Sequence, residues 1–360
     1  MATLPKPNGK YGVHLSTMKL TDETRIDPFA SIHQFRSVMI SAFYPVVLTD
    51  ECRTRLVSYM LPATATIESQ YYSQYGLPTG TFEKLQLSLC KVDCRMTAPL
   101  DEFPIVLFSP GLGNSRLLYS AIAQSIASSG NIVISIDHPY DANVVEYPDG
   151  TLVLAANISS DAQIKLDVNT RVKDASFILD QLSLTPTVRL LFPSANGHLK
   201  THNVTMYGHS VGGAAAAAAM LEDSRIIGGA NLDGSFFGPV IEQGLNRPFL
   251  IFGHEGKNQS TDPSWKAIWP RLRGWKLELM LHGAQHATFS DLPLLVKVLG
   301  LDKVLPPEAA TLLGMLDGVR ALDVVSAYLV AFFDFVRSGI PAHLLQGPAK
   351  EYPEISLVAT

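Results

Sequence analysis

Short apolar runs alternate with stretches of helical periodicity over most of the chain after residue 103. The runs cover residues 104–109, 131–136, 204–207, 226–232, 248–252 and 275–281. Continuous apolar runs of this length are typical of strands that are buried on both faces. Helical spacing marks several segments between and after the runs, namely 115–129, 161–184, 322–336 and a helix expected to start near Thr288. The alternation predicts an α/β fold, with a mostly parallel central sheet covered by helices on both faces.

The remaining segments carry weaker patterns. Residues 1–36 show little apolar periodicity, and residues 37–47 predict one strand of an antiparallel edge. Residues 48–101 predict an insertion or cap built from loops and a helix, and residues 144–154 predict a β-hairpin. Among the runs, 275–281 is expected to be the last strand of the chain.

The composition supports a large folded domain. Of the 360 residues, 47% are hydrophobic and 17% are charged, which provides ample apolar surface for a core. An α/β chain of this length often forms one domain with insertions. We therefore expect a single domain over residues 1–360, in which 300–345 is a C-terminal helical part.

Charge and targeting signals exclude several classes of protein. The net charge is −5 and no Lys/Arg cluster is present, which argues against a nucleic-acid partner. No apolar run approaches the ~18 residues that a transmembrane helix needs. The N-terminus lacks the apolar core of a signal peptide, so we expect a cytoplasmic protein with reduced thiols. A disulfide among Cys52, Cys90 and Cys94 stays open, as does the oligomeric state.

One motif carries a specific chemical prediction. Gly-His-Ser-Val-Gly at 208–212 follows the run 204–207 and precedes a row of alanines over 214–219. In a strand–turn–helix setting this motif lifts the serine hydroxyl above the sheet edge, and its glycines let strand and helix approach closely. We interpret Ser210 as a nucleophile.

A serine nucleophile needs a base, which this type of site takes from a histidine beyond the last strand. His282 and His286 both follow the run 275–281. His282 is expected still to belong to the strand, whereas the loop after Gly283 can bring His286 back toward Ser210, so we favour His286. The spacing of the two histidines suits zinc only on a helix, and Gly283 argues against one. No metal is expected.

Three carboxylates are candidates for the residue that orients the base. Asp233 directly follows the run 226–232, while Glu255 and Asp262 follow the next run. We favour Asp233, because a strand end fixes its backbone, whereas Asp262 is expected in a polar loop.

Two backbone amides are candidates for an oxyanion hole, which stabilises the charge that develops during acyl transfer. Val211 follows the nucleophile, and Leu112 lies between two glycines after the run 104–109. Five aromatic residues are candidates for the wall of the substrate pocket, with an ordinary core role as the alternative: Tyr119, Phe236, Phe237, Trp265 and Trp269.

Several segments resemble the platelet-activating factor acetylhydrolase family of α/β-hydrolases (isoform II or plasma type), in particular its fungal relatives. They are Phe-Ser-Pro-Gly-Leu-Gly at 108–113, Leu-Tyr-Ser-Ala-Ile at 118–122, the nucleophile motif, Leu-Asp at 232–233 and Gln-His-x-x-Phe at 285–289. The resemblance covers roughly 103–290, with a weaker match at 8–13. It implies an α/β-hydrolase fold, Asp233 as the acid and Leu112 as an oxyanion donor.

Two departures limit what the resemblance implies. Pro110 stands where the family often has histidine. Residues 48–101 and 300–345 do not match the lipid-binding surface of the family clearly. The resemblance therefore implies the chemistry better than it implies the substrate.

The sequence predicts a cofactor-free serine esterase that cleaves a short or medium acyl ester, such as a phospholipid acetyl ester, through an acyl-enzyme. The expected partner is a small-molecule ester. The alternative is a biosynthetic tailoring hydrolase that uses the same triad on a thioester, lactone or polyketide-like metabolite. A non-catalytic binding protein of the same fold is disfavoured, because Ser210, Asp233 and His286 are all present.

Overall fold

The computed structural model describes residues 1–47, 54–91, 100–193, 195 and 197–360. The described chain falls into two compact units. The first contains Met1–Val106, Gly113–Ile158 and Asp174–Thr201, and the second contains Leu107–Leu112, Ser159–Lys173 and His202–Thr360. The residues expected to act in catalysis and in the oxyanion hole all belong to the second unit.

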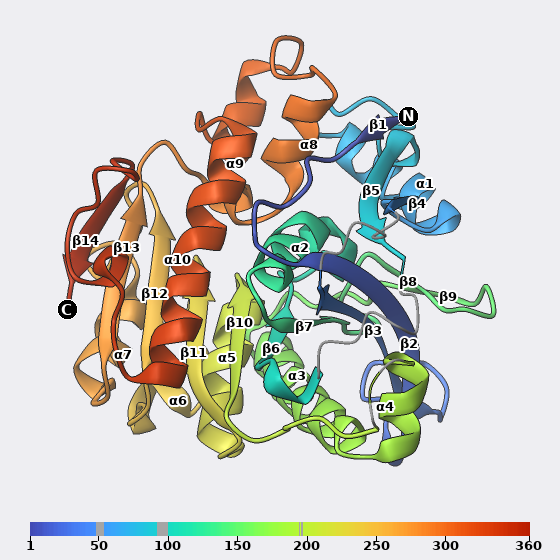
Figure 1. Cartoon of the computed structure of the whole chain (residues 1–360), viewed down its shortest axis with the longest axis horizontal. Helices are drawn as coiled ribbons and strands as arrows, with labels where there is room; N and C mark the ends of the chain where they lie inside the picture. The colour runs from blue at the N-terminus through green and yellow to red at the C-terminus, as the bar shows by residue number, and fades with distance from the viewer. Residues whose placement is uncertain (48–53, 92–99, 194, 196) are drawn as a thin grey trace. The chain divides into compact units, whose positions relative to one another are not determined.

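The second unit is built on parallel strands. Their order is β14-β13-β12-β11-β10, and the carboxyl-terminal part of β6 lies next to β10 (Figure 1). Pairing from β10 to β13 is parallel, whereas β14 is antiparallel to β13. The strands are β6 (Ile105–Ser109), β10 (Val204–His209), β11 (Ile226–Leu232), β12 (Phe249–His254), β13 (Lys276–Leu281) and β14 (Ile355–Ala359). The six apolar runs after residue 103 thus include five strands of this unit.

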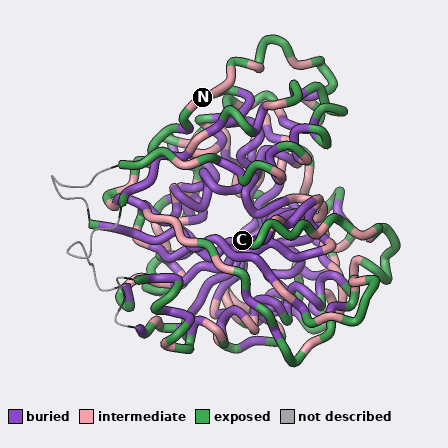
Figure 2. The backbone as a smooth tube through the Cα atoms, turned by 90° about the vertical axis from the view of Figure 1, so that its right-hand side faces the viewer, coloured by how far each residue is buried: buried purple, intermediate pink, exposed green. Residues whose placement is uncertain are grey.

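The expectation that 275–281 is the last strand is wrong, because β14 adds an antiparallel strand at the edge of the sheet. Of its residues only Ile355 is buried, whereas β10 to β12 are buried along almost their whole length. Figure 2 colours the backbone by burial, with buried segments in purple and exposed segments in green. A half-exposed edge strand lacks the long apolar run that identifies a strand buried on both faces.

Helices cover both faces of this sheet. Successive residues of a strand point to opposite faces, and the neighbouring glycines Gly228 and Gly229 of β11 show what lies on each. A Cβ atom on Gly228 would meet Val336 of α10 (Gly318–Ser338), and one on Gly229 would meet Met220 of α5 (Val211–Glu222). Helices α5 and α10 therefore pack on opposite sides of β11.

The remaining helices of the second unit are mostly short. They are the part of α3 (Asp161–Leu182) up to Lys173, α6 (Val240–Gln243), α7 (Pro263–Ile268), α8 (Leu292–Val298) and α9 (Ala310–Leu313). The helix expected near Thr288 begins at Leu292, because residues 286–289 form a separate 3-10 turn. Within the described residues, no helix is both long and apolar enough to cross a membrane.

The first unit contains an antiparallel sheet in the order β7-β3-β2. Its strands are β2 (Gly12–Ile26), β3 (Phe35–Val46) and β7 (Ile132–Asp137), and α2 (Ser120–Ser128) packs against β3 and β7. The strand expected over 37–47 is β3, but it is paired on both sides instead of lying at an edge. The edge strand β2 was not expected, because its alternating polar residues give no continuous apolar run.

The expected insertion at 48–101 contains more strand than the sequence predicts. Its described part holds β4 (Thr54–Ser58), α1 (Pro62–Ser73) and β5 (Leu85–Cys90), and β1 (Ala2–Thr3) completes a small sheet in the order β1-β5-β4. The first unit also holds the expected hairpin, β8 (Val144–Glu146) with β9 (Leu152–Leu154), and α4 (Thr185–Leu191). Cys90 is buried, and Cys52 and Cys94 lie outside the described residues.

Candidate active site

Four neighbouring parallel strands of the second unit each deliver one polar side chain at the carboxyl-terminal end. Ser210 directly follows β10, Asp233 directly follows β11, His254 ends β12, and His286 lies in the loop after β13. Parallel pairing brings these ends to one edge of the sheet. Ligand sites of open α/β sheets form at this edge, so we take it as the candidate active site.

The turn at Ser210 has the strained backbone of a nucleophile elbow. Ser210 has φ 55° and ψ −125°, and its backbone N–H donates to the carbonyl oxygen of Leu232 at 2.8 Å. A Cβ atom on Gly208 would lie 2.1 Å from the backbone of Gly212, and one on Gly212 would lie 2.0 Å from the carbonyl oxygen of Ser109. Both glycines of the motif are therefore required by close backbone contacts.

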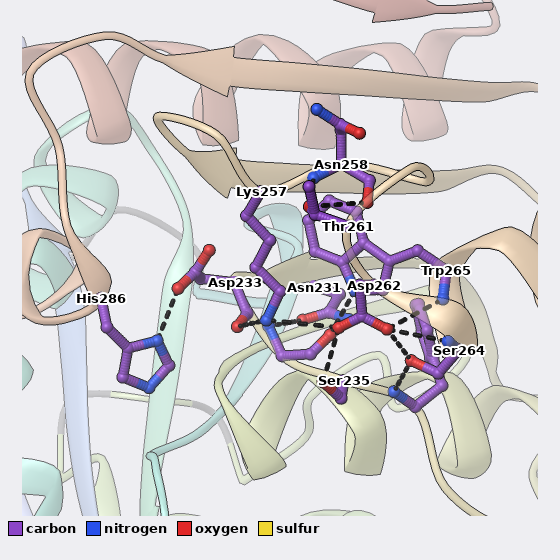
Figure 3. Close-up of polar contacts among 12 residues, drawn as sticks. Asn231, Asp233, Ser235, Lys257, Asn258, Thr261, Asp262, Ser264, Trp265 and His286 are labelled. Carbon is purple, nitrogen blue, oxygen red and sulfur yellow. Dashed lines mark hydrogen bonds and ion pairs between the residues drawn. The ribbon is translucent and has the colours of Figure 1, made fainter.

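The carboxylate of Asp233 and the imidazole of His286 are in direct contact (Figure 3). Nδ1 of His286 lies 2.5 Å from Oδ2 of Asp233. The Asp233 side chain is fully buried, whereas that of His286 is 43% exposed. Burial by itself would raise the pKa of Asp233, but hydrogen bonds from His254 and His286 and the charge of Lys257 hold it well below its usual range. Since an ionised carboxylate only accepts, Nδ1 of His286 carries the proton and Nε2 is available as a base.

A second histidine, which the sequence analysis missed, contacts the same carboxylate. Nδ1 of His254 lies 2.7 Å from Oδ1 and 2.8 Å from Oδ2 of Asp233, and the backbone N–H of His254 donates to Oδ1 at 3.0 Å. Its position in the sequence could have pointed to it. His254 is the last residue of β12, and some hydrolases of this kind carry the acid after that strand.

A polar network lies behind Asp233 (Figure 3). Nζ of Lys257 donates to the backbone carbonyl oxygen of Asp233 at 2.7 Å and lies 3.5 Å from Oδ2 of Asp262. Asp262 also accepts from the hydroxyl of Ser235 at 2.6 Å. The network fixes the turn that follows β11, and with it the backbone of Asp233.

The structure places the two alternative acids away from His286. Asp262 is not in a solvated loop: it is buried and caps the start of α7, where it accepts from the backbone of Ser264 and Trp265. Asp at a helix N-cap is stabilising, which the sequence analysis overlooked. Glu255 is exposed and accepts from the backbone N–H of Gly283 at 2.9 Å.

The other candidate base, His282, contacts residues outside the site. The strand β13 ends at Leu281, so His282 follows the strand instead of belonging to it. Its Nε2 lies 2.7 Å from the hydroxyl of Ser356, and its Nδ1 lies 3.4 Å from Glu255.

His209, the residue before the nucleophile, supports the histidine loop. Its Nε2 lies 2.9 Å from the carbonyl oxygen of His286, and the two rings are 4.5 Å apart between centroids. Burial, with the neighbouring His286 adding to it, holds the pKa of His209 well below its usual range. The ring is therefore neutral, and donation to a carbonyl requires its proton on Nε2. This contact ties the loop of His286 to the strand that carries Ser210.

The two residues expected to donate to an oxyanion share one apolar cluster. Val211 is buried in it together with Val168 of α3, and the partly exposed Leu112, Ile164 and Phe237 pack against it. The structure thus brings the start of α5 and the loop after β6 together. The close approach of Gly212 to Ser109, described above, has the same effect.

The loop after β6 is held by an arginine that the sequence analysis did not single out. Nη1 of Arg171 donates to the carbonyl oxygen of Pro110 at 2.5 Å and to the hydroxyl of Ser109 at 3.0 Å. One turn earlier on α3, Asp167 pairs with Nε of Arg171 at 2.8 Å, and both side chains are buried. The pair braces the two residues that precede Gly111 and Leu112.

Of the five aromatic candidates for a pocket wall, Phe237 lies in a groove of the described residues. It is partly exposed and lines an apolar groove of about 340 Å³ together with Val168 and Ala218. Phe236 is buried, and so is Trp265, whose indole N–H donates to the carbonyl oxygen of Gly234 at 2.6 Å. These two side chains therefore pack inside the protein.

Trp269 and Tyr119, the last two candidates, have other surroundings. Trp269 stacks under the ammonium of Lys276, the first residue of β13, and therefore lies at the amino-terminal end of the strands, opposite the site. Tyr119 belongs to the first unit, where it is fully buried and its hydroxyl accepts from Asn114 at 3.0 Å. Aromatic residue type alone does not distinguish a pocket wall from a core position.

Comparison with known proteins identifies the relatives of the chain. The family model of platelet-activating factor acetylhydrolase, isoform II, matches residues 2–182. A protein of Arthroderma benhamiae named "probable 1-alkyl-2-acetylglycerophosphocholine esterase" is 32% identical over 98% of this chain and 92% of its own length. The platelet-activating factor acetylhydrolase of Cavia porcellus is 23% identical over 92% of this chain and 77% of its own length.

A solved structure of an esterase has a similar fold. The ferulic acid esterase of Streptomyces cinnamoneus superposes with a TM-score of 0.80 and 29% identity, covering 99% of both chains. The expected α/β-hydrolase fold is confirmed, and the protein is a carboxylic-ester hydrolase. The extent of these matches shows that the chain belongs to the platelet-activating factor acetylhydrolase, isoform II, family.

Proposed function

We propose that this protein hydrolyses an acetyl ester of a platelet-activating-factor-like lipid through an acyl-enzyme on Ser210. The observation that carries the proposal is the 2.5 Å contact between buried, ionised Asp233 and His286 at the sheet edge where Ser210 occupies a strained turn. A histidine held in this way is the base that a serine hydroxyl needs.

In the first half of the reaction, Nε2 of His286 removes the proton of the Ser210 hydroxyl while its oxygen attacks the carbonyl carbon of the ester. The carbonyl oxygen becomes an oxyanion, which the backbone N–H groups of Leu112 and Val211 stabilise. Asp233 holds the ring and stabilises the imidazolium that forms. Collapse of the tetrahedral intermediate breaks the ester bond, and His286 gives its proton to the departing alcohol.

In the second half, a water molecule replaces the alcohol. His286 takes a proton from the water, and the hydroxide attacks the acyl carbon of the acyl-enzyme. The bond to Ser210 breaks, the proton returns to its oxygen, and the carboxylic acid leaves. Each residue is restored to its starting protonation state.

The apolar surroundings of Leu112 and Val211 support a lipid-like ester. Ile164, Val168 and Phe237 lie in the same cluster, and the groove lined by Phe237 continues between α3 and α5. The names of the fungal and mammalian relatives indicate acetyl esters of glycerophospholipids as their substrates. A short acyl group beside an apolar surface is consistent with both observations.

The test is a comparison of kcat/KM for phosphocholine lipids that differ only in the acyl group at the second glycerol position. We expect the acetyl ester to be hydrolysed fastest, the palmitoyl ester to be a poor substrate, and Ser210→Ala to be inactive on both. Faster hydrolysis of the palmitoyl ester, or activity confined to thioesters or lactones, would contradict the proposed substrate. The latter result would favour the tailoring hydrolase instead.

A further inference from the structure

We propose that His254 is a positioning residue of this site, which holds the Asp233 carboxylate so that one oxygen faces His286. The inference rests on the proposed function and deepens it, because it assigns a second histidine to the catalytic carboxylate. The two histidines have different tasks: His286 exchanges protons with the substrate, and His254 acts only through Asp233.

His254 contacts both oxygens of the Asp233 carboxylate, whereas His286 contacts one of them. Oδ1 of Asp233 accepts from the backbone N–H of His254 at 3.0 Å and from its Nδ1 at 2.7 Å. The same Nδ1 lies 2.8 Å from Oδ2, which faces Nδ1 of His286 at 2.5 Å. A rotation of the carboxylate that moved Oδ2 away from His286 would therefore break the contacts with His254.

Burial makes these contacts important. The Asp233 side chain has no exposed surface, whereas that of His254 is 24% exposed. A buried carboxylate oxygen without a donor is costly, because no water replaces the lost hydrogen bond. The donors from His254 satisfy the oxygen that His286 does not use, and this keeps Asp233 ionised and in one orientation.

The strand order explains why a residue of β12 can do this. β12 lies between β11, which positions Asp233, and β13, which precedes His286. The end of β12 is the place where the sequence analysis put the two alternative acids. In this chain the end of β12 carries His254, which donates to the acid Asp233. The next residue, Glu255, accepts from the backbone N–H of Gly283 instead.

The other charged and titratable groups around His254 and Asp233 come from four elements. Lys257, after β12, bonds to the backbone of Asp233 and is paired with Asp262 at the start of α7. His209 of β10 lies against His286, and Glu255 lies against His282. None of these groups replaces the two side-chain contacts of His254 within the described residues.

The position of His254 predicts an electrostatic effect as well as a geometric one. A donor on Asp233 draws negative charge away from the side that faces His286. Without that donor, Asp233 stabilises protonated His286 more strongly, so a higher pH is needed to free the base. A residue that only supported the fold would not shift the pH–rate profile in this way.

The experiment compares His254→Ala, His254→Asn and the control His282→Asn. Asparagine retains an N–H donor near the position of Nδ1, whereas alanine removes it, and His282 is the histidine that contacts Glu255 and Ser356 instead of Asp233. We expect His254→Ala to lower kcat by about 10- to 100-fold with KM little changed, since a small misplacement of a catalytic group has this effect. The acid limb of the pH–rate profile of His254→Ala should move to higher pH. His254→Asn and His282→Asn should keep kcat and the pH–rate profile near those of the wild type.

Two results would overturn the inference. One is wild-type kcat and an unshifted pH profile in His254→Ala. The other is an equal loss of kcat in His254→Ala and His254→Asn without any shift of the acid limb, which is the signature of a structural role.

A second measurement works without turnover and separates this inference from the proposed function. The Nδ1 proton of His286, bound to Asp233, should give a low-field ¹H NMR resonance that moves in His254→Ala and stays in place in His282→Asn. An active Ser210→Ala variant would refute the proposed nucleophile but leave this resonance interpretable. An unmoved resonance in folded His254→Ala would refute the positioning role alone.

Discussion

Arg171 of α3 donates to the carbonyl oxygen of Pro110 at 2.5 Å and is paired with Asp167 at 2.8 Å. Through this bond a buried ion pair fixes the loop that carries Leu112, one of the two proposed oxyanion donors. If Leu112 donates to the oxyanion as proposed, the packing of α3 affects the rate of the chemical step.

We predict that Arg171→Met lowers both stability and kcat. It leaves Asp167 as a buried carboxylate without its cation, which typically costs about 3–5 kcal/mol of unfolding free energy. The double variant Arg171→Met/Asp167→Leu removes both charges and should regain most of this stability in chemical denaturation. Its kcat should stay at least about tenfold below wild type, because the Pro110 carbonyl still lacks its donor. Wild-type kcat in the double variant would show that the loop does not depend on Arg171.

A second prediction concerns stability and pH in the first unit. Glu68 of α1 is fully buried, and this burial raises its pKa from the usual 4.5 to about 8, with a hydrogen bond from Asn143 acting in the opposite direction. Between these two values the folded state binds a proton that the unfolded state has released, so stability falls as pH rises. We expect Glu68→Gln to remove up to about 4 kcal/mol of this fall between pH 5 and 8.

Thermal denaturation from pH 5 to pH 8 checks the sign of this effect. Glu68→Gln should gain stability relative to wild type as pH rises, while Glu102→Gln, at an exposed position of the same unit, should follow wild type. A parallel pH dependence of wild type and Glu68→Gln would contradict the buried neutral acid.

We also predict that Asp233→Asn lowers kcat by about three to four orders of magnitude with KM little changed. The amide cannot hold the His286 ring in the required tautomer or stabilise the imidazolium. Glu255→Gln should stay within about threefold of wild type, since an exposed carboxylate outside the site affects the rate little. Steady-state kinetics on one acetyl ester checks both, and near-wild-type kcat in Asp233→Asn would refute its role.

The groove beside Phe237 predicts a change in specificity. Phe237→Ala enlarges the apolar space between α3 and α5. We therefore expect kcat/KM to rise for esters with longer acyl chains relative to the acetyl ester. One methylene in an apolar pocket is worth about 0.8 kcal/mol, which corresponds to roughly fourfold in relative kcat/KM per carbon where the chain is buried. Trp269→Ala, at the opposite end of the strands, is the control. It should leave the ratio of kcat/KM for the octanoyl ester to kcat/KM for the acetyl ester unchanged. An unchanged ratio in Phe237→Ala would remove Phe237 from the substrate site.

Local sequence signals predicted the parts of the site that local geometry determines. Gly208 is required by a backbone contact within one strand–turn–helix unit, and Gly212 by the close approach of Ser109 in β6. The five-residue motif records both requirements. The long apolar runs predicted the buried strands, because a strand buried on both faces needs apolar residues along its whole length. The edge strands β2 and β14 were missed, because half-exposed strands lack such runs.

Contacts between distant residues could not be predicted from the sequence. His254 reaches Asp233 across 21 positions of the chain, and Arg171 reaches Pro110 across 61. The indole of buried Trp265 likewise donates to Gly234 across 31 positions, a contact that no periodicity reveals. Asp262 is different, since Asp before Pro-Ser at a helix start is a local capping signal that could have been used.

The central claim is that Ser210, activated by the pair of His286 and Asp233, forms the acyl-enzyme. The most direct test is peptide-mapped mass spectrometry of the protein after treatment with a fluorophosphonate, which labels activated serines covalently. We predict a single adduct on Ser210 in the wild-type protein, no adduct in Ser210→Ala, and a much slower reaction in His286→Ala. An adduct on another residue, or equal labelling of Ser210→Ala, would contradict the account.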